Sequence, residues 1–131
     1  MSESPEISIV TPSFRGAPWL PLAIASVADQ AVRAEHIVQD AGSDDGTLDW
    51  LTTDPRVRAF VEPDRGMYDA VNRGYRRART DILAYLNCDE QYLPNALARV
   101  LAFFDHHPAV DIVFGDCLVT DATGKYVCER R

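Results

Sequence analysis

Hydrophobic and polar positions divide the chain into short β-branched runs and longer segments with apolar residues at helical spacing. The short runs predict strands at 7–11, 35–40, 56–62, 82–86 and 110–114. The longer segments predict helices at 19–30, 48–51, 67–79 and 94–105, and a turn at 121–124 predicts a hairpin over 116–128. Strands that alternate with helices indicate an α/β fold with a mainly parallel sheet between helices, which is a three-layer arrangement.

Composition and charge narrow the possible functions. The 131 residues are 47% hydrophobic and 25% charged, as expected for a single globular domain spanning residues 1–131. No apolar run approaches the ~20 residues of a membrane helix and no signal peptide pattern is present, so we expect a cytoplasmic protein. The net charge of −7 argues against a nucleic-acid partner. It remains compatible with a phosphate ligand, because a bound metal ion reverses the local field.

The cysteines show no metal or disulfide pattern. The chain has three cysteines, an odd number, and none of them forms a CxxC motif: Cys88, Cys117 and Cys128. We therefore expect reduced thiols.

Polar clusters follow four of the predicted strands. They lie at 12–15, 40–43, 62–65 and 87–90. In parallel sheets, ligands bind beyond the carboxyl ends of the strands. We therefore expect the four clusters to meet at one edge of the sheet and to form a ligand site.

The cluster at 87–90 contains two adjacent carboxylates, Asp89 and Glu90, directly after an apolar strand. Carboxylate oxygens are hard ligands that suit Mg²⁺ or Mn²⁺ shared with the phosphates of a ligand. The alternative is a solvated helix N-terminus, where acidic residues interact favourably with the helix dipole.

Asp40 ends the second predicted strand. An aspartate there can accept a hydrogen bond from a base N–H or a ribose hydroxyl, and Gly42 lets the backbone approach a ligand. The alternative is a cap for the following helix. Because Ser43, Asp44 and Asp45 are better placed for capping, we expect Asp40 to be free for the ligand.

Arg65 follows the third predicted strand. Its guanidinium matches the geometry of a diphosphate, although an exposed loop arginine is an equal alternative. A nicotinamide- or flavin-binding Rossmann site is not indicated, because the chain has no GxGxxG after a strand. A P-loop is absent as well, because the chain has no GxxxxGK[ST].

Four segments together resemble one known family. They are TPSFR at 11–15, IVQDAGSDDGT at 37–47, EPDRGMYDAVNRG at 62–74 and LNCDEQYLP at 86–94. The chain is similar to the N-terminal, nucleotide-sugar-binding half of inverting family-2 glycosyltransferases, especially those that build bacterial surface polysaccharides. The resemblance implies a GT-A fold that ends after the donor half, with LNCDE as the metal-binding DXD region.

The resemblance also implies roles for particular residues. Phe14 would lie against the base, with Pro12 at its edge, and Asp40 would contact the base or ribose. Asp89 and Glu90 would hold the Mg²⁺ or Mn²⁺ ion that bridges the diphosphate, with Arg65 assisting. The implied nucleotide-sugar-binding residues are Pro12, Phe14, Asp40, Asp64, Arg65 and Asp89.

The chain departs from the family pattern at several positions. Arg15 stands where asparagine is usual, Ala41 where many members carry a second aspartate, and Glu90 where aspartate is usual. Family members take their general base, a carboxylate, from a later segment, so we expect the base beyond Arg131 and the acceptor half to be lacking.

The implied activity is inverting sugar transfer from a nucleoside-diphosphate sugar, of the UDP or dTDP type, to a glycan or lipid-linked acceptor. Peripheral association with the inner face of the membrane and self-association are compatible with it. One alternative is a non-catalytic nucleotide-sugar-binding or assembly module. Another is a phosphatase of the haloacid dehalogenase type, suggested by Asp45-Gly46-Thr47, but Ser43 stands where its nucleophilic aspartate is needed.

Overall fold

The structure, a computed structural model, describes residues 3–131. The chain forms two compact units, with the boundary between Leu101 and Ala102 inside helix α4 (Ala96–His106). Each unit is described by itself. That residues 1–131 form a single donor domain remains a prediction.

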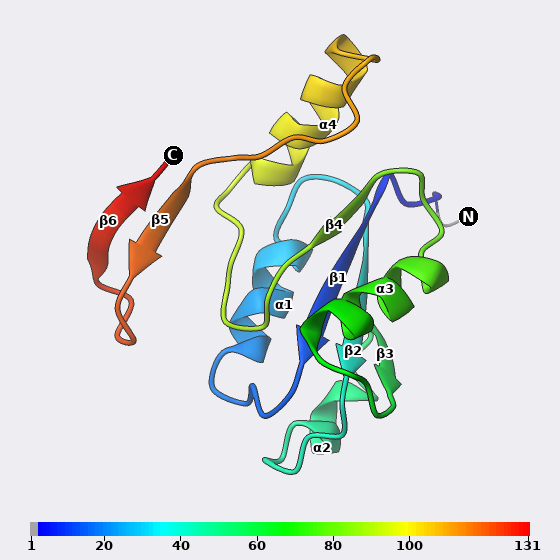
Figure 1. Cartoon of the computed structure of the whole chain (residues 1–131), viewed down its shortest axis with the longest axis vertical. Coiled ribbons are helices and arrows are strands. Elements are labelled where there is room, and N and C mark those ends of the chain that lie inside the picture. Colours follow the sequence, from blue (N-terminus) through cyan, green and yellow to red (C-terminus); the bar gives the residue numbers. More distant parts are fainter. Residues whose placement is uncertain (1–2) are drawn as a thin grey trace. The chain divides into compact units, whose positions relative to one another are not determined.

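The first unit contains a four-stranded parallel sheet in the order β3-β2-β1-β4 (Figure 1). Its strands are β1 (Ile7–Ser13), β2 (Ala34–Asp40), β3 (Arg58–Val61) and β4 (Leu83–Tyr85). The helices that connect them are α1 (Leu20–Ala28), α2 (Leu48–Leu51) and α3 (Met67–Arg77). The predicted α/β fold with a mainly parallel sheet is confirmed.

The central strand β1 separates two helical layers. Ile7 and Ile9 pack in one apolar cluster with Ala23 and Val27 of α1. Val10, which points to the other face of the strand, meets Gly74 of α3. All seven residues of β1 are buried, as expected for a strand covered on both faces. The predicted three-layer arrangement is therefore present in this unit.

A buried carboxylate anchors the sheet beneath the end of α3. Glu35 accepts hydrogen bonds from the Ser8 hydroxyl (2.9 Å), from Arg58 Nη1 (2.7 Å) and from the Arg79 amide (2.9 Å). A buried charge is tolerated only when it is paired and hydrogen-bonded, and these partners meet that need.

The second unit contains a β-hairpin formed by β5 (Cys117–Thr120) and β6 (Tyr126–Arg130). The Asp121 carboxylate closes its turn by accepting hydrogen bonds from the Thr123 and Lys125 amides. The predicted hairpin is confirmed.

The strand predicted at 110–114 is wrong. These residues have no strand assignment and pair with no strand within residues 3–131. Ile112 and Phe114 are 70% and 90% exposed. A β-branched sequence becomes a strand only where a neighbouring strand satisfies its backbone groups, and no strand described in residues 3–131 pairs with this segment.

None of the helices described within residues 3–131 has the length and apolar character needed to span a bilayer.

Gly74 gives a test of the packing between α3 and β1. A methyl group there would overlap Val10 Cγ1 and lie 2.8 Å from Val10 Cγ2. We expect Gly74→Ala to lower the free energy of unfolding by about 1–3 kcal/mol through overpacking. Alanine's helix preference of about 1 kcal/mol will not prevent this. Urea unfolding checks it, with Gly115→Ala, which meets nothing within 4 Å, as the control. Equal midpoints for both variants would contradict the close contact.

His36 makes the stability dependent on pH. It is 4% exposed, its Nε2 lies 2.7 Å from Thr11 Oγ1, and burial lowers its pKa to about 4. In the unfolded chain its pKa is about 6.5, so the unfolded state takes up the proton first as the pH falls. Stability should therefore be full above pH ~6.5 and fall towards pH ~4.

Between pH 6.5 and 5, above the main carboxylate titrations, we expect a loss of about 1.6 kcal/mol, because the unfolded histidine is half protonated at pH 6.5 and almost fully protonated at pH 5. Urea unfolding at several pH values measures it. The loss should be much smaller in His36→Gln and unchanged in His106→Gln. A wild-type slope in His36→Gln would show that another group titrates.

Candidate functional site

Backbone hydrogen bonds join the four parallel strands at or near their carboxyl ends. The Ala41 amide donates to Ser13 O (3.0 Å), the Glu62 amide to Asp40 O (3.0 Å) and the Leu86 amide to Val10 O (2.9 Å). The arrowheads of β1, β2 and β3 point to the same edge in Figure 1. The polar clusters therefore lie at one edge of the sheet, which confirms the predicted convergence.

Asp40 is fully buried and organises the turn after β2. Its Oδ1 accepts from the amides of Gly42 (2.8 Å) and Ser43 (2.7 Å), and its Oδ2 accepts from the Ser43 hydroxyl (2.8 Å). Gly42 has φ +99°, a conformation that favours glycine. The expectation that Asp40 is free for the ligand is not met in this respect, because its carboxylate closes its own turn; a contact between Asp40 and a ligand stays a prediction.

Asp44 and Asp45, which were expected to cap the following helix, make other contacts. Asp44 forms a two-pronged ion pair with Arg15 (2.7 and 2.9 Å), and Asp45 accepts from the Ala17 amide (2.9 Å). Asp45 also accepts from the Thr47 amide (3.2 Å) and hydroxyl (2.6 Å) at the start of α2, but the N-cap residue Thr47 itself makes no side-chain capping bond within residues 3–131. The expected capping role is thus replaced by contacts that link the β2–α2 loop to the loop after β1.

Phe14 and Arg15 form a stacked pair in the loop after β1. Phe14 is 53% exposed, and the Arg15 guanidinium carbon lies 4.9 Å from its ring centroid. Arg15 has a positive φ of 53°, and its amide donates to Ser43 Oγ (2.9 Å). The hydrogen bond from Arg15 holds the pKa of Asp44 below its usual range. Asp44 thus keeps the guanidinium over one face of the Phe14 ring.

Cys88 joins the loop after β4 to the same group. A Cβ on Gly16 would lie 2.9 Å from Cys88 Sγ, so the two loops touch where residue 16 has no side chain. Burial, followed by the charge of Asp89, raises the pKa of Cys88. Asp40 adds a smaller contribution in the same direction. The thiol is therefore protonated at neutral pH.

Asp89 and Glu90 are both exposed in the turn after β4. Glu90 Oε2 accepts from the Asn87 amide (3.2 Å), whereas Asp89 makes no side-chain hydrogen bond or ion pair within residues 3–131. In that range, no group of three His, Cys, Asp or Glu residues is arranged to hold a metal ion. Mg²⁺ is commonly held by one or two carboxylates together with substrate phosphates and water, and Asp89 fits that type of site.

Asp64 and Arg65 lie in the loop between β3 and α3. Asp64 Oδ1 accepts from the Gly66 amide (2.9 Å), and the Arg65 amide donates to Asp69 Oδ2 (2.9 Å). The Arg65 side chain is exposed and forms no ion pair among the described residues. It is therefore available to an anionic ligand.

The strand order sets where these groups lie along the edge. Because β3 and β4 are the outer strands, Arg65 and Asp89 follow strands three spacings apart, which is roughly 14 Å. Phe14 and Asp40 follow the two strands between them, and Pro12 is buried within β1. A ligand that contacts all of these residues must lie across the strand ends.

The sequence did not predict the roles of three residues at this edge. Ser43, expected to cap the following helix, instead bridges Asp40 and Arg15. Ser13 Oγ and Asn87 Oδ1 are buried, and neither has a hydrogen-bond partner within residues 3–131. Buried polar atoms are rarely left unpaired, so these two atoms mark the edge as a polar site.

Comparison with known proteins identifies the family. The profile described as glycosyl transferase family 2 matches residues 8–126. The chain belongs to glycosyl transferase family 2. This membership removes the phosphatase alternative, and Asp45 is in any case bound to Ala17 and Thr47.

Two relatives in the family illustrate the match. A PGL/p-HBAD biosynthesis glycosyltransferase of Mycobacterium bovis is 35% identical over 130 residues, which cover 94% of this chain and 51% of the relative. An uncharacterized glycosyltransferase of Mycobacterium tuberculosis is 34% identical over 106 residues, which cover 77% of this chain and 40% of the relative. The chain thus spans about half the length, or less, of these relatives.

Solved structures of similar fold include two glycosyltransferases. TarS of S. aureus, in complex with UDP-GlcNAc, has a TM-score of 0.71 at 19% identity over 79% of this chain and 32% of its own. The mannosyltransferase PcManGT from Pyrobaculum calidifontis, with GDP-Man and Mn²⁺, has a TM-score of 0.68 at 23% identity over 79% of this chain and 33% of its own. At such identities the likeness shows the fold alone, and it confirms the predicted GT-A fold.

Asp40 can be tested as the organiser of the turn in this family-2 chain. Asp40→Ala removes three hydrogen bonds to a buried carboxylate, so we expect a loss of about 3 kcal/mol in unfolding free energy. Asp40→Asn keeps an acceptor for the two amides and should lose about 1 kcal/mol. Urea unfolding measures both, with the exposed Asp49→Ala as control. Equal stability of Asp40→Ala and wild type would contradict the role.

Proposed function

We propose that the chain binds a nucleoside-diphosphate sugar across the carboxyl edge of its sheet and contributes the donor side of a glycosyltransferase. The observation that carries this proposal is the joining of four polar loops at one edge, in a family-2 chain with the GT-A fold. Ligands of open α/β sheets bind at this edge. The unpaired Ser13 Oγ and Asn87 Oδ1 support a polar ligand there.

The base end of the site would lie over the loops after β1 and β2. Phe14 offers one free ring face, because Arg15 covers the other. Pro12 lies in the strand that leads to it. Asp40 is buried and holds the turn, so we propose that it acts on the base or ribose mainly by shaping this loop. A uridine or deoxythymidine nucleotide is the ligand we favour. GDP-Man in the mannosyltransferase structure makes guanosine the competitor to test.

The diphosphate of the ligand would be contacted from the loops that follow the outer strands β3 and β4. Arg65 carries a free guanidinium, which suits phosphate oxygens, and Asp64 holds the turn of the same loop through Gly66. On the other side, Asp89 and the free oxygen of Glu90 would hold Mg²⁺ or Mn²⁺. The ion would neutralise charge on the departing diphosphate. PcManGT, which shares the fold, is solved with Mn²⁺.

The reaction we propose is transfer of the sugar to a hydroxyl of a glycan or lipid-linked acceptor, with inversion at the anomeric carbon. The residues above bind and orient the donor, and none of them is assigned as the general base. A cytoplasmic location, with peripheral association at the inner face of the membrane, and self-association belong to the same proposal.

A non-catalytic binding module is the second candidate, because the residues at this edge account for donor binding and none of them is assigned as a general base. Both candidates predict nucleotide binding. Transfer to an acceptor by the longest natural form of the protein would support the enzyme. Binding without transfer by that form would support the module.

Metal dependence gives the main test. Without a divalent ion, the diphosphate would face the carboxylates of Asp89 and Glu90, and like charges repel. We expect UDP or dTDP to raise the melting temperature in Mn²⁺ and much less in chelator, because a ligand of the folded state stabilises it. Calorimetric titration should show at least about tenfold weaker binding in chelator, which corresponds to ~1.4 kcal/mol.

Asp89→Asn should weaken binding in Mn²⁺ by about tenfold and have little effect in chelator. Asp81→Asn is the matched control, because Asp81 is exposed and precedes the same strand. Equal affinity with and without chelator would remove the metal from the proposal. Absence of any nucleotide binding would remove the donor site itself.

A further inference from the structure

Arg73 of α3 links two carboxylates, which lie on either side of the loop that contains Arg65. Its Nε donates to Asp69 Oδ2 (3.0 Å), and its Nη1 lies 3.4 Å from Glu62 Oε1. The Arg73 side chain is 32% exposed, and the hydrogen bond to Asp69 raises its pKa. A guanidinium can hold two acceptors at once, because its donors form a rigid fork. Arg73 therefore connects the end of β3 to the first turn of α3.

The Asp69 end of this link fixes the backbone of Arg65. Asp69 Oδ2 accepts from the Arg65 amide (2.9 Å) as well as from Arg73. The hydrogen bond from the Arg65 amide holds the pKa of Asp69 below its usual range, so the carboxylate is charged at neutral pH. Gly66 follows with φ +112°, where any other residue would be strained. The direction in which the chain leaves Arg65 is thus set by Asp69 and Gly66.

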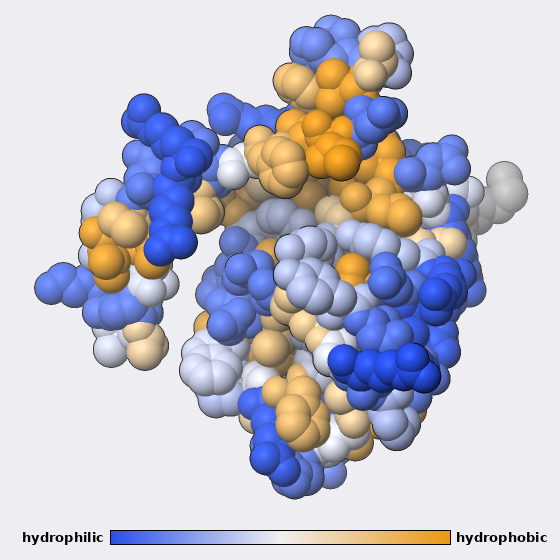
Figure 2. All heavy atoms as spheres, in the orientation of Figure 1, coloured by the Kyte–Doolittle hydropathy of each residue, from blue (hydrophilic) through white to orange (hydrophobic). Residues whose placement is uncertain are grey.

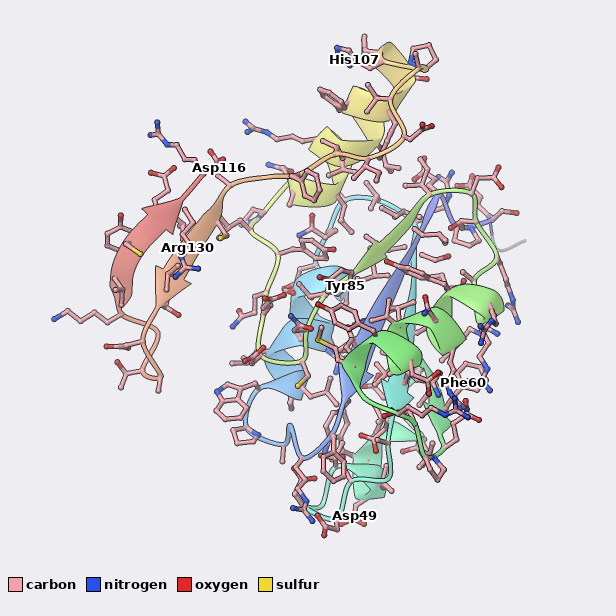
Figure 3. The ribbon with its side chains drawn as sticks, in the orientation of Figure 1. Asp49, Phe60, Tyr85, His107, Asp116 and Arg130 are labelled. Atoms are coloured by element: carbon pink, nitrogen blue, oxygen red, sulfur yellow. The ribbon has the colours of Figure 1, made fainter. Side chains whose placement is uncertain are left out.

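The Glu62 end is tied to the sheet. Glu62 Oε1 accepts from Arg77 Nη1 (2.7 Å) and from Gln39 Nε2 (2.8 Å), and the Glu62 amide donates to Asp40 O. The Arg77 guanidinium in turn lies 4.1 Å from the ring centroid of Phe60, which Figure 3 shows beside α3. Glu62 is therefore an anchor with several partners on β2, β3 and α3.

The arginines of this region divide into two kinds. Arg73 and Arg77 are engaged with carboxylates, whereas Arg65 has no ion pair within residues 3–131. The face that carries α3 is largely hydrophilic in Figure 2, as expected for a helix with this charged side. The Arg65 side chain, which has no ion pair within residues 3–131, is therefore attached to a backbone that the contacts of Arg73 and Arg77 hold in place.

We propose that Arg73 is a positioning residue for the nucleotide sugar: by bridging Glu62 and Asp69 it holds the loop from which Arg65 reaches the diphosphate. This inference rests on the proposed function, specifically on Arg65 contacting phosphate. In this proposal Arg73 acts through the loop, because its Nε and Nη1 face the two carboxylates. Loss of Arg73 weakens binding only through the loop, so its effect depends on the presence of Arg65.

A double-mutant cycle with UDP and Mn²⁺ tests the inference, with affinities from calorimetric titration. Arg65→Ala should weaken binding by about tenfold or more, as expected for a lost charged hydrogen bond. Arg73→Ala should weaken binding by about three- to tenfold in the wild-type background. In the Arg65→Ala background, Arg73→Ala should weaken it less than twofold, because the loop then presents nothing to the phosphates.

Arg56→Ala is the matched control. Arg56 also makes a two-pronged ion pair, with Asp54, but it precedes β3 at the opposite edge of the sheet. Its removal should leave UDP affinity within twofold of wild type. Amide hydrogen exchange at Arg65 should be faster in Arg73→Ala and unchanged in Arg56→Ala. If Arg73→Ala folds poorly, Arg73→Gln, which keeps most of the stem, takes its place in the cycle.

The outcomes separate the two proposals. No effect of Arg65→Ala on binding would overturn the phosphate role assigned to Arg65 under the proposed function. A clear effect of Arg65→Ala with none of Arg73→Ala would overturn the positioning inference alone. Additive losses in the double variant would also overturn it, because they would show that Arg73 acts independently of Arg65.

Discussion

Burial of β1 on both faces is the constraint on which the first unit depends. The strand pairs in parallel with β2 and β4, and α1 and α3 cover its two faces. Parallel pairing puts all four carboxyl ends at one edge. The close approach of Val10 to Gly74 adds a second restriction, because it leaves no room for a side chain on α3 at that point. The position of every candidate ligand group follows from this arrangement.

The loops at the edge are held by one another more than by the helices that follow them. Asp44 pairs with Arg15, Asp45 accepts from the Ala17 amide, and Cys88 packs on Gly16. The Arg15–Asp44 pair is exposed, and such pairs contribute little to stability. Their value is geometric, because they keep the arginine over Phe14 and so leave one ring face open.

Exposed charged side chains lie in the loops that follow both outer strands of the sheet. Exposed Asp89 and Glu90 follow one outer strand, and the free Arg65 follows the other. Between them Asp40 is buried and Asp44 is paired with Arg15, whereas Asp45 is exposed and accepts hydrogen bonds from Ala17 and Thr47. The acids of the middle loops are therefore occupied by contacts within the protein. The phosphate-binding roles under the proposed function depend on this division.

The sequence by itself determined the order of elements, the parallel sheet and the family, because hydrophobic periodicity and the four motifs are local patterns. It also located the edge at which the motifs meet. Only the tertiary structure decided which acids are free, since Asp40 closes its own turn while Asp44 pairs with Arg15, 29 residues earlier. It likewise decided that 110–114 is not a strand, although its sequence is β-branched. The physical reason is the same in each case: hydrogen bonds and strand pairing depend on partners that are distant in the chain.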